Sequence, residues 1–516
     1  MRERAQRREA GRETTDDGEG PTSGAQAPGA EPATNGRRRL GVDASHHHYK
    51  WWALSCTSLG MLLATINSGT LIIALPDLGD ALHTSILSLV WVILAYMIAS
   101  TVLVLTAGRL SDLFGRKKAY VAGFVVFGLA SLGAGFSPDG NVLIAWRVLQ
   151  GIGGAFLFAN AGAIVTDAFP KEELGLAMGT NTMVAAIGLV LGPVLGGGLV
   201  AIGWQWVFWF NVPLTLVGAL WAAKVLHELA KPDKIRGYDI VGTATFVVGL
   251  SGLVYGVSRG GLDGWTDPLT LWPIVAGAIL IPAFVLIERG QRAPMLDLSI
   301  FNNRLFSAAT AAAFINGLSR FALMFLFVFY FQGVKGDDPI IAGVKLAPMA
   351  IGMLIASPLA GVWADRRGSR TLAALGMLVS AVALAGMTML GVGTSYWIST
   401  LWLFVVGVGS GMFNSPNTAA MMGTVPAQRR GVAAGARMML QNTGAVLSIA
   451  FVLAVVTTAV PKDVLFKIFS GVATGLSAHQ LAPFIANMHT ALWVLAATSV
   501  VGAVVSLMRP RDVHHG

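Results

Sequence analysis

Long apolar runs alternate with short polar segments along most of the chain. A helix needs about twenty apolar residues to cross a bilayer core of roughly 30 Å, and its backbone polar groups are paired within the segment. Fourteen runs meet that requirement, so the pattern predicts an all-α membrane protein with fourteen transmembrane helices. The runs lie near residues 52–75, 87–108, 118–136, 141–165, 175–200, 206–227, 239–258, 268–287, 305–331, 341–364, 371–391, 396–420, 430–456 and 488–508.

The two ends of the chain and one internal segment lack this pattern. Residues 1–50 are polar and nearly free of large apolar side chains, so they cannot offset the entropy of ordering, and we expect a disordered cytoplasmic tail. The histidines at 46–48 are expected to be solvated and not to bind a metal. Residues 455–490, which include Pro483, are interpreted as a loop, and residues 509–516 as a cytoplasmic C-terminal tail.

Composition supports a membrane protein. Hydrophobic residues make up 54% of the chain and charged residues 12%, whereas soluble domains carry about 25% charged residues. The 62 glycines suit closely packed membrane helices. A single cysteine, Cys56, excludes an intrachain disulfide and a four-cysteine metal site.

The basic residues predict the orientation of the chain. If the N-terminus is cytoplasmic, seventeen Lys and Arg residues fall in cytoplasmic loops and four in the opposite loops, namely Arg259, Lys335, Lys462 and Lys467. Cytoplasmic loops of membrane proteins carry such an excess. The net charge of +9 is therefore interpreted as a topology signal and not as a nucleic-acid site, and both termini are expected to be cytoplasmic.

Two predicted cytoplasmic loops carry the same pattern. In each, a glycine is followed four residues later by aspartate, then by a second glycine and a basic residue. Glycine permits a tight turn, and the acid can pair with arginine or with a helix N-terminus in one conformation and release it in another. Eight spans separate the copies, so the chain divides into six, two inserted and six helices. The pattern residues are Gly108, Asp112, Gly115 and Arg116, and Gly361, Asp365, Gly368 and Arg370.

Three further motifs strengthen this internal repeat. The fourth span reads LIAWRVLQGIG over 143–153, the fifth contains Gly-x-x-x-Gly-Pro-x-x-Gly-Gly over 188–197, and residues 204–213 read WQWVFWFNVP. With the two loops, these motifs make residues 51–508 resemble the major facilitator superfamily, specifically its fourteen-helix drug:proton antiporter branch.

The resemblance implies two pseudo-symmetric six-helix bundles that rock about a central site, with two extra helices between them. The N-terminal bundle is expected over residues 51–230, the two extra helices over 231–304 and the C-terminal bundle over 305–508. The implied function is export of small amphipathic or lipophilic compounds in exchange for protons.

The arginine and proline motifs have specific expected roles. Arg147 lies inside an apolar span, where a charge is costly unless it meets a partner or a cavity, and the resemblance implies that it couples protons. Pro193 bends its helix, and flanking glycines allow close helix approach, so this motif is interpreted as a hinge or seal between the bundles. The alternative is close packing alone. The motif residues are Gly188, Gly192, Pro193 and Gly197.

Several polar and aromatic residues near the middle of spans are candidates for a substrate cavity, because aromatic walls with few polar groups suit apolar ligands. Each could instead pack against, or bond to, a neighbouring helix. Arg437 could also reach the cytoplasmic interface with its long side chain. The candidate cavity residues are Asn67, Trp91, Tyr96, Asn316, Arg320, Phe413, Asn414 and Asn417.

The chain lacks the carboxylate that many relatives carry in the first span, where Asn67 stands instead. Asn cannot titrate, and no Asp or Glu lies near the middle of any predicted span. We therefore expect a proton pathway to use Asp77 or Asp80 near Arg147 at the outside. Asp112 or Asp167 would carry the proton at the cytoplasmic side. The competing hypothesis is that the charge or protonation of the substrate carries the coupling.

Other functions remain open at this point. The same cavity could export an endogenous lipid, siderophore or secondary metabolite, and a membrane scaffold or enzyme belongs to a different class. The chain has no metal-ligand cluster in its spans, no nucleophile–base constellation and no phosphate-cradling loop, so we expect neither an enzyme nor a cofactor. Expected partners are a small amphipathic substrate, protons and the lipid bilayer. High Ala, Gly and Arg usage suits a bacterium with GC-rich DNA, so we expect the protein in a bacterial inner membrane.

Overall fold

The computed structural model describes residues 48–510, apart from 171–172, 229–238, 292–293, 295, 297, 426–429, 459 and 470–475. Throughout the described residues the regular structure is helical, which confirms the predicted all-α class. Residues 1–47 of the expected N-terminal tail and 511–516 of the C-terminal tail lie outside the described part of the chain.

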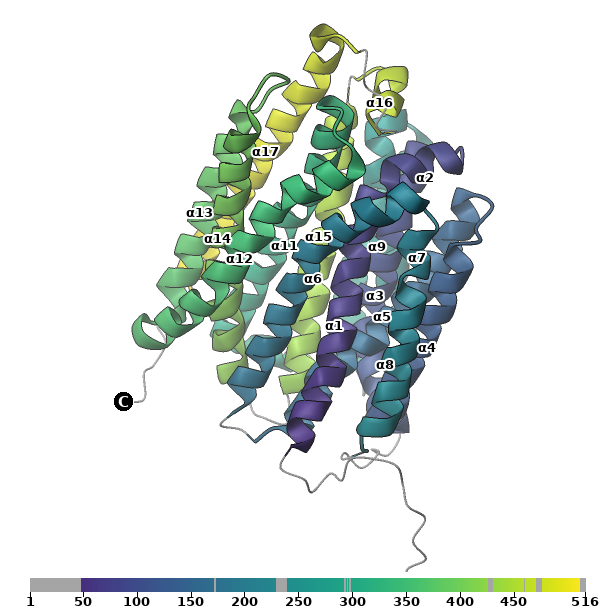
Figure 1. The fold of residues 1–516 in the computed structure, drawn as a ribbon. Helices are drawn as coiled ribbons and strands as arrows, with labels where there is room; N and C mark the ends of the chain where they lie inside the picture. The colour runs from purple at the N-terminus through teal and green to yellow at the C-terminus, as the bar shows by residue number, and fades with distance from the viewer. Residues whose placement is uncertain are drawn as a thin grey trace, which may run out of the picture. The chain divides into compact units, whose positions relative to one another are not determined.

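Among the described residues, thirteen helices are long and apolar enough to cross a membrane, and α6 is a further helix of 29 residues, which together make fourteen. The chain is thus a multi-pass membrane protein. We call the end of the bundle where α1 begins the Tyr49 end, and the end where α1 stops the Ile73 end. The spanning helices, in chain order, are α1 (Tyr49–Ile73), α3 (Ile86–Phe114), α4 (Arg116–Ala134), α5 (Gly140–Ala168), α6 (Leu174–Ile202), α7 with α8 (Trp206–Trp209 and Asn211–Val225), α9 (Ile240–Asp263), α10 (Pro268–Gly290), α11 (Arg304–Val328), α12 (Pro339–Arg367), α13 (Ser369–Gly386), α14 (Tyr396–Gly423), α15 (Arg430–Thr457) and α17 (Ala478–Leu507) (Figure 1).

Short helices extend or connect these spans. At the Ile73 end, α2 (Leu75–Ala81) follows α1, and α16 (Lys462–Phe469) lies between α15 and α17. The 3₁₀ helices are η2 (Leu298–Asn302) and η4 (Met387–Met389). A π-helix, η3 (Phe329–Val334), continues α11 at the Ile73 end.

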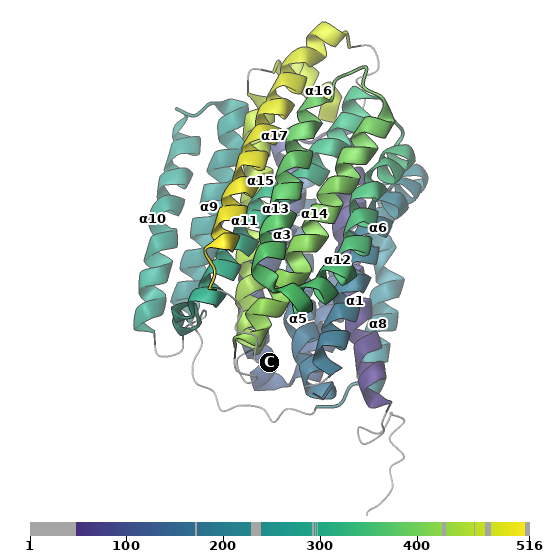
Figure 2. The same ribbon diagram turned by 90° about the vertical axis from the view of Figure 1, so that its left-hand side faces the viewer.

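The packing of the spans repeats between the two halves of the chain. Helix α1 packs on α6, α3 on α5 and α4 on α8, and correspondingly α11 packs on α15, α12 on α14 and α13 on α17. Contacts of α6 with α12 and of α3 with α15 join the halves. This is the arrangement of two pseudo-symmetric six-helix bundles. The inserted helices α9 and α10 pack on each other, and α9 also packs on α3 and α15, which leaves α10 at the side of the bundle (Figure 2).

The predicted loop over 455–490 is wrong in its second half, because α17 begins at Ala478 and not near residue 488. Ser477 and Gln480 form a capping box in which each side chain accepts a hydrogen bond from the backbone nitrogen of the other residue. Such a cap satisfies the free donors of a helix N-terminus and starts the helix upstream of Pro483. The predicted loop between α15 and α17 also contains α16.

Glycines bring neighbouring helices into backbone contact, as the composition suggested. A Cβ atom at Gly153 of α5 would lie 2.6 Å from the backbone nitrogen of Phe127 of α4. A side chain there would force the two helices apart, so the α4–α5 contact depends on this glycine.

We expect Gly153→Ala to lower the free energy of unfolding by about 1–3 kcal/mol, the usual cost of overpacking a tight core. Gly198→Ala is the matched control, since nothing lies within 4 Å of its added Cβ. Thermal unfolding of both variants in detergent measures the difference. Equal stabilities would show that the α4–α5 contact tolerates a methyl group.

Candidate functional site

Arg147 of α5 is at the centre of a buried polar network in the N-terminal bundle. The residue is 1% exposed. Its Nε donates a hydrogen bond to the carbonyl oxygen of Val92 on α3 at 2.9 Å, and its Nη1 donates to the Oε1 of Gln150. The Nε2 of Gln150 in turn donates to Asn67 Oδ1 at 3.2 Å and to Ser131 Oγ at 2.7 Å. The network therefore links α1, α3, α4 and α5.

Tyr96 and Asn211 extend this network. The Arg147 guanidinium lies 4.4 Å from the centroid of the Tyr96 ring, a cation–π contact. The Nδ2 of Asn211 donates to Asn67 Oδ1 at 3.4 Å. Among the described residues, neither the Asn67 amide nitrogen nor the Tyr96 hydroxyl has a hydrogen-bond partner. The sequence singled out Asn67, Tyr96 and Arg147 as site residues, whereas Gln150 was noted only as part of the motif over 143–153. Its spacing of three residues from Arg147 on one helix was a usable signal of its role.

Neutral groups surround Arg147, and no carboxylate among the described residues forms an ion pair with it. Asp77 and Asp80 both lie in α2, and among the described residues neither forms an ion pair with Arg147. Their part in a proton pathway stays a prediction. Burial raises the pKa of the Asp77 carboxyl, and the nearby Asp80 raises it further. Burial also raises the pKa of Asp80, while His83 opposes that effect.

The other candidate cavity residues contact neighbouring helices. The Trp91 ring lies 6.0 Å from that of Tyr255 on α9. Phe413 is buried in an apolar cluster with Met377, and the Nδ2 of Asn316 contacts the Met377 sulfur at 3.3 Å. The Nδ2 of Asn417 donates to a backbone oxygen of α11 at 3.2 Å. Their part in a substrate cavity stays a prediction.

The repeated loop pattern has the same backbone geometry in both copies. Gly115 has φ of 102° and Gly368 has φ of 85°, a left-handed conformation that favours glycine. Each glycine ends one span and begins the next, α3 to α4 and α12 to α13. Gly108 and Gly361 lie further back along α3 and α12, and Arg370 is in the first turn of α13. The expectation of a tight glycine turn is therefore confirmed.

Arg116 connects the first loop to its surroundings at the Tyr49 end. Its Nη1 forms an ion pair with Asp167 Oδ2 of α5 at 2.6 Å, and its backbone nitrogen donates to Glu228 Oε1 at 2.7 Å. The side chains of Asp112 and Asp365 lie outside what the structure describes, so their expected partners remain predictions.

The proline-containing helix α6 makes backbone contacts with a helix of each bundle. A Cβ at Gly192 would lie 2.9 Å from Gly69 Cα of α1. A Cβ at Gly197 would lie 2.6 Å from the backbone nitrogen of Ile340 of α12, and one at Gly343 would lie 2.7 Å from the carbonyl carbon of Pro193. Gly188 likewise faces α1. The contacts at Gly197 and Gly343 join the two bundles at the Ile73 end, and those at Gly188 and Gly192 lie within the N-terminal bundle.

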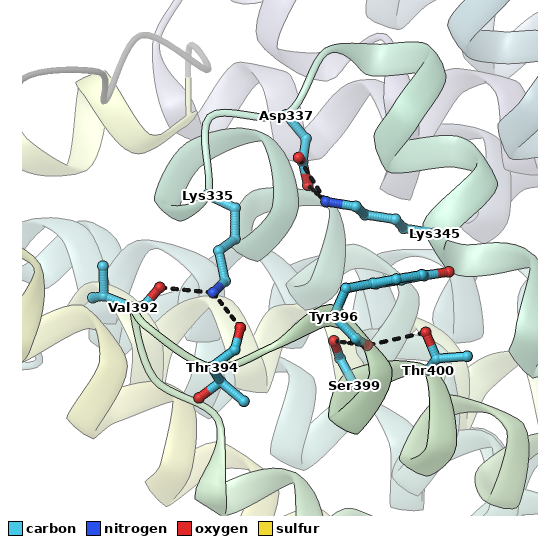
Figure 3. Close-up of polar contacts among 8 residues, drawn as sticks. All are labelled: Lys335, Asp337, Lys345, Val392, Thr394, Tyr396, Ser399 and Thr400. Carbon is cyan, nitrogen blue, oxygen red and sulfur yellow. Dashed lines mark hydrogen bonds and ion pairs between the residues drawn. The ribbon is translucent and has the colours of Figure 1, made fainter.

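A charged cluster that sequence reasoning missed lies beside this junction (Figure 3). Lys345 of α12 reaches both carboxylate oxygens of Asp337, at 2.6 and 2.5 Å, and its ammonium lies 5.3 Å from the Tyr396 ring centroid. Lys335 donates to the carbonyl oxygens of Val392 and Thr394. Burial and the nearby Lys345 lower the pKa of Lys335, while Asp337 opposes them. The cluster fixes the π-helix η3 against α12 and the start of α14.

One polar contact then crosses between the bundles. The Nε2 of Gln332, in η3, donates to the carbonyl oxygen of Ile73 at 3.1 Å. Ile73 is the last residue of α1, so this bond satisfies a carbonyl that the helix itself leaves free. Together with the α6–α12 contact, it closes the Ile73 end in this structure.

We expect Gln332→Ala to loosen that closure. Loss of a hydrogen bond worth about 0.5–1.5 kcal/mol corresponds to a roughly 2–10-fold shift between closed and open states. The measurement is the maleimide labelling rate of Ala342→Cys, introduced at a buried position of α12 in a Cys56→Ala background, on protein in detergent. Ser399→Ala, which removes only a bond within α14, is the control. An unchanged labelling rate would contradict a role for Gln332 in closure.

Comparison with known proteins supports both the fold and the relationship. The family model described as "Major Facilitator Superfamily" matches residues 57–449. The tetracenomycin C resistance and export protein of Streptomyces glaucescens is 29% identical over 78% of this chain and 74% of that protein. The multidrug resistance protein Stp of Mycobacterium tuberculosis (strain CDC 1551 / Oshkosh) is 31% identical over 77% of this chain and 74% of its own length.

A solved structure has the same fold. The crystal structure of a bacterial homolog to the human lysosomal transporter Spinster, in an inward-facing and unoccupied conformation, matches with a TM-score of 0.64. The match covers 90% of this chain and 98% of that chain at 14% sequence identity, so it bears on the fold alone.

Proposed function

Because the chain belongs to the Major Facilitator Superfamily, we propose that it is a secondary active transporter that exports small amphipathic or lipophilic compounds in exchange for protons. The observation that carries the proposal is the match along most of the chain to proteins named for drug export and multidrug resistance. The chain acts as a carrier and not as an enzyme.

The moving parts are the two bundles, residues 51–230 and 305–508, with residues 231–304 as an inserted helix pair. Alternating access requires that the bundles separate at one end while they meet at the other. The α6–α12 contact and the bond from Gln332 to Ile73 support closure at the Ile73 end, so the state described here precedes opening at that end. The glycines and Pro193 of α6 act as the seal.

The Tyr49 end is cytoplasmic in this proposal. The loops at this end hold seventeen basic residues and the loops at the other end hold four, which supports that orientation. Both termini then lie on the cytoplasmic side of a bacterial inner membrane. Export then runs from the Tyr49 end to the Ile73 end, and protons run the other way.

Proton coupling has to work without a carboxylate in the middle of any span. Asn67, in the network around Arg147, stands where many relatives carry that carboxylate. Asp77 and Asp80 follow Asn67 closely in the sequence. The raised pKa of Asp77 allows that carboxyl to keep its proton at a higher pH than an ordinary aspartate. Asp167, paired with Arg116, and Asp112 would release protons at the Tyr49 end.

Uptake into inverted membrane vesicles with an imposed pH gradient tests the proposal. The probes are one cationic, one neutral and one anionic fluorescent amphiphile, because the charge of the substrate is part of the question. We expect uptake of at least one probe to depend on the gradient and on Arg147, and Arg147→Ala to reduce it to the level of empty vesicles. No uptake above empty vesicles for any probe would favour a dedicated lipid, siderophore or metabolite exporter.

Replacing Asp77 and Asp80 together by Asn tests the proton pathway. The double variant cannot bind and release protons at α2, so gradient-driven uptake should fall to the level of empty vesicles, while binding of the probe to purified protein persists. Asp139→Asn is the matched control, an N-cap residue of α5 with no place in the pathway. Undiminished gradient-driven uptake in the double variant would refute this pathway and favour coupling by the charge of the substrate.

A further inference from the structure

The C-terminal bundle has arginines within its spans but no acid in the middle of those spans, since Asp365 lies at the last turn of α12. Arg320 lies in α11 and Arg437 in α15. The sequences of the four helices around them contain no Asp or Glu over residues 304–334, 339–364, 396–421 and 433–457. Any compensating negative charge must therefore come from outside these spans.

Arg320 is the less satisfied of the two. Its Nη1 contacts only the Met353 sulfur of α12, at 3.9 Å, and its guanidinium lies 4.9 Å from the Phe321 ring centroid. Its Nε is buried and has no hydrogen-bond partner. A thioether is a weak acceptor and an aromatic ring a weak partner, so most of the five donors of this guanidinium are free to bind another group.

Arg437 begins a short polar chain that leads toward α14. Its Nη1 donates to Gln441 Oε1 at 2.9 Å, and Gln441 Nε2 donates to Asn414 Oδ1 at 3.3 Å. The Nε of Arg437 is buried without a partner. The amides of this chain are neutral, so they orient the guanidinium but leave its charge in place.

Helix packing brings the two arginines to the same part of the bundle. A Cβ at Gly317 would lie 3.2 Å from the backbone nitrogen of Ala445, so the turn before Arg320 packs on the turn after Gln441. Helices α11 and α15 run parallel, because Ala322, like Gly317, meets a residue about 126 positions later, Ser448. At about 1.5 Å per residue, Arg320 and Arg437 then lie roughly 14 Å apart along the bundle. Gly411 of α14 packs on Met353, the residue whose sulfur atom contacts Arg320. The turn that contains Asn414 therefore lies near Arg320. Two long side chains at that spacing can reach one ligand.

Arg147 shows what a satisfied arginine looks like in this chain. A carbonyl oxygen, an amide oxygen and an aromatic ring occupy its guanidinium. Within the part of the chain that the structure describes, Arg320 has no oxygen partner, and Arg437 has one. Because a guanidinium stays protonated in proteins and an uncompensated charge in a membrane is costly, the free donors favour an anionic ligand.

We propose that Arg320 and Arg437 bind the anionic group of the substrate, a carboxylate, sulfonate or similar oxyanion, so that the exported compounds are amphipathic anions. This inference rests on the proposed export function and narrows its substrate class. A carboxylate or sulfonate matches the planar fork of a guanidinium and accepts charge-assisted hydrogen bonds. A lipophilic cation at the same place would meet two positive charges and be disfavoured.

The test measures binding first and transport second. The probes are fluorescein sulfonate, an anion, and rhodamine 123, a cation with a related ring system, and binding to purified protein is followed by fluorescence polarisation without a pH gradient. We expect the wild type to bind the anion more tightly than the cation. The double variant Arg320→Gln, Arg437→Gln should lose anion affinity by about tenfold or more, the range expected when hydrogen bonds to a charged group are lost.

Two further variants keep the result decisive. Arg320→Lys with Arg437→Lys retains both charges and should keep most of the anion affinity, which a merely structural role for the arginines would not predict. Arg304→Gln removes one exposed charge from the same helix α11 and should change nothing. If thermal unfolding shows that the double Gln variant does not fold, the single Arg437→Gln variant replaces it. Its anion affinity is compared with that of the Arg304→Gln variant. Loss of one hydrogen bond to a charge predicts that the affinity falls by about threefold or more.

The outcomes separate this inference from the proposed function. Tighter binding of the cation than of the anion by the wild type, or anion affinity that survives removal of both charges, would overturn the anionic site. Gradient-dependent uptake of the cation in vesicles together with such a result would leave export intact and refute only the substrate class. Anion binding that depends on the arginines, without gradient-dependent uptake of any probe, would refute proton-driven export and leave the anion site standing.

Discussion

Close approach of helix backbones is the constraint on which this architecture depends. In a bilayer the lipid tails are as apolar as leucine, so helices gain stability from packing and not from leaving water. Helix α6 uses that principle on two sides at once, because glycines contact α1 within its own bundle and Ile340 and Gly343 of α12 across the junction. The same helix is therefore part of the core of one bundle and part of the moving surface between the two.

Charge follows a different logic in the two bundles. In the N-terminal bundle, Arg147 is enclosed by neutral oxygen acceptors and an aromatic ring, which stabilise its charge. In the C-terminal bundle, Arg320 has only a sulfur atom and a ring beside it. The pseudo-symmetry of the helices thus does not extend to the partners of the arginines that they carry.

Much of the fold could be predicted from the sequence because membrane thickness fixes the length of each apolar run. The tight turns at Gly115 and Gly368 were also predictable, since the repeated pattern requires glycine at a left-handed position. The start of α17 was not, because Pro483 suggested a loop while the capping box at Ser477 decides where the helix begins.

The site was harder to predict than the fold. Asn67, Tyr96 and Arg147 could be singled out as polar or aromatic residues inside apolar runs. Their mutual contacts depend on how four helices are rotated, which a single sequence does not specify. The pair of Lys345 and Asp337 escaped notice because Lys345 lies within an apolar run and its partner in the preceding turn, so neither stood out alone.

The π-helix at the end of α11 gives the Ile73 end a mechanical property that an ordinary helix would lack. A π turn contains one more residue than an α turn. If the turn changed to α geometry, the register of the helix would shift by one position, which rotates the side chains of that turn by about 100°. Gln332 lies within this segment, so such a shift would carry its side chain away from Ile73 while α11 below it stays in place. The contact between the two bundles at the Ile73 end thus depends on the register of a single π turn.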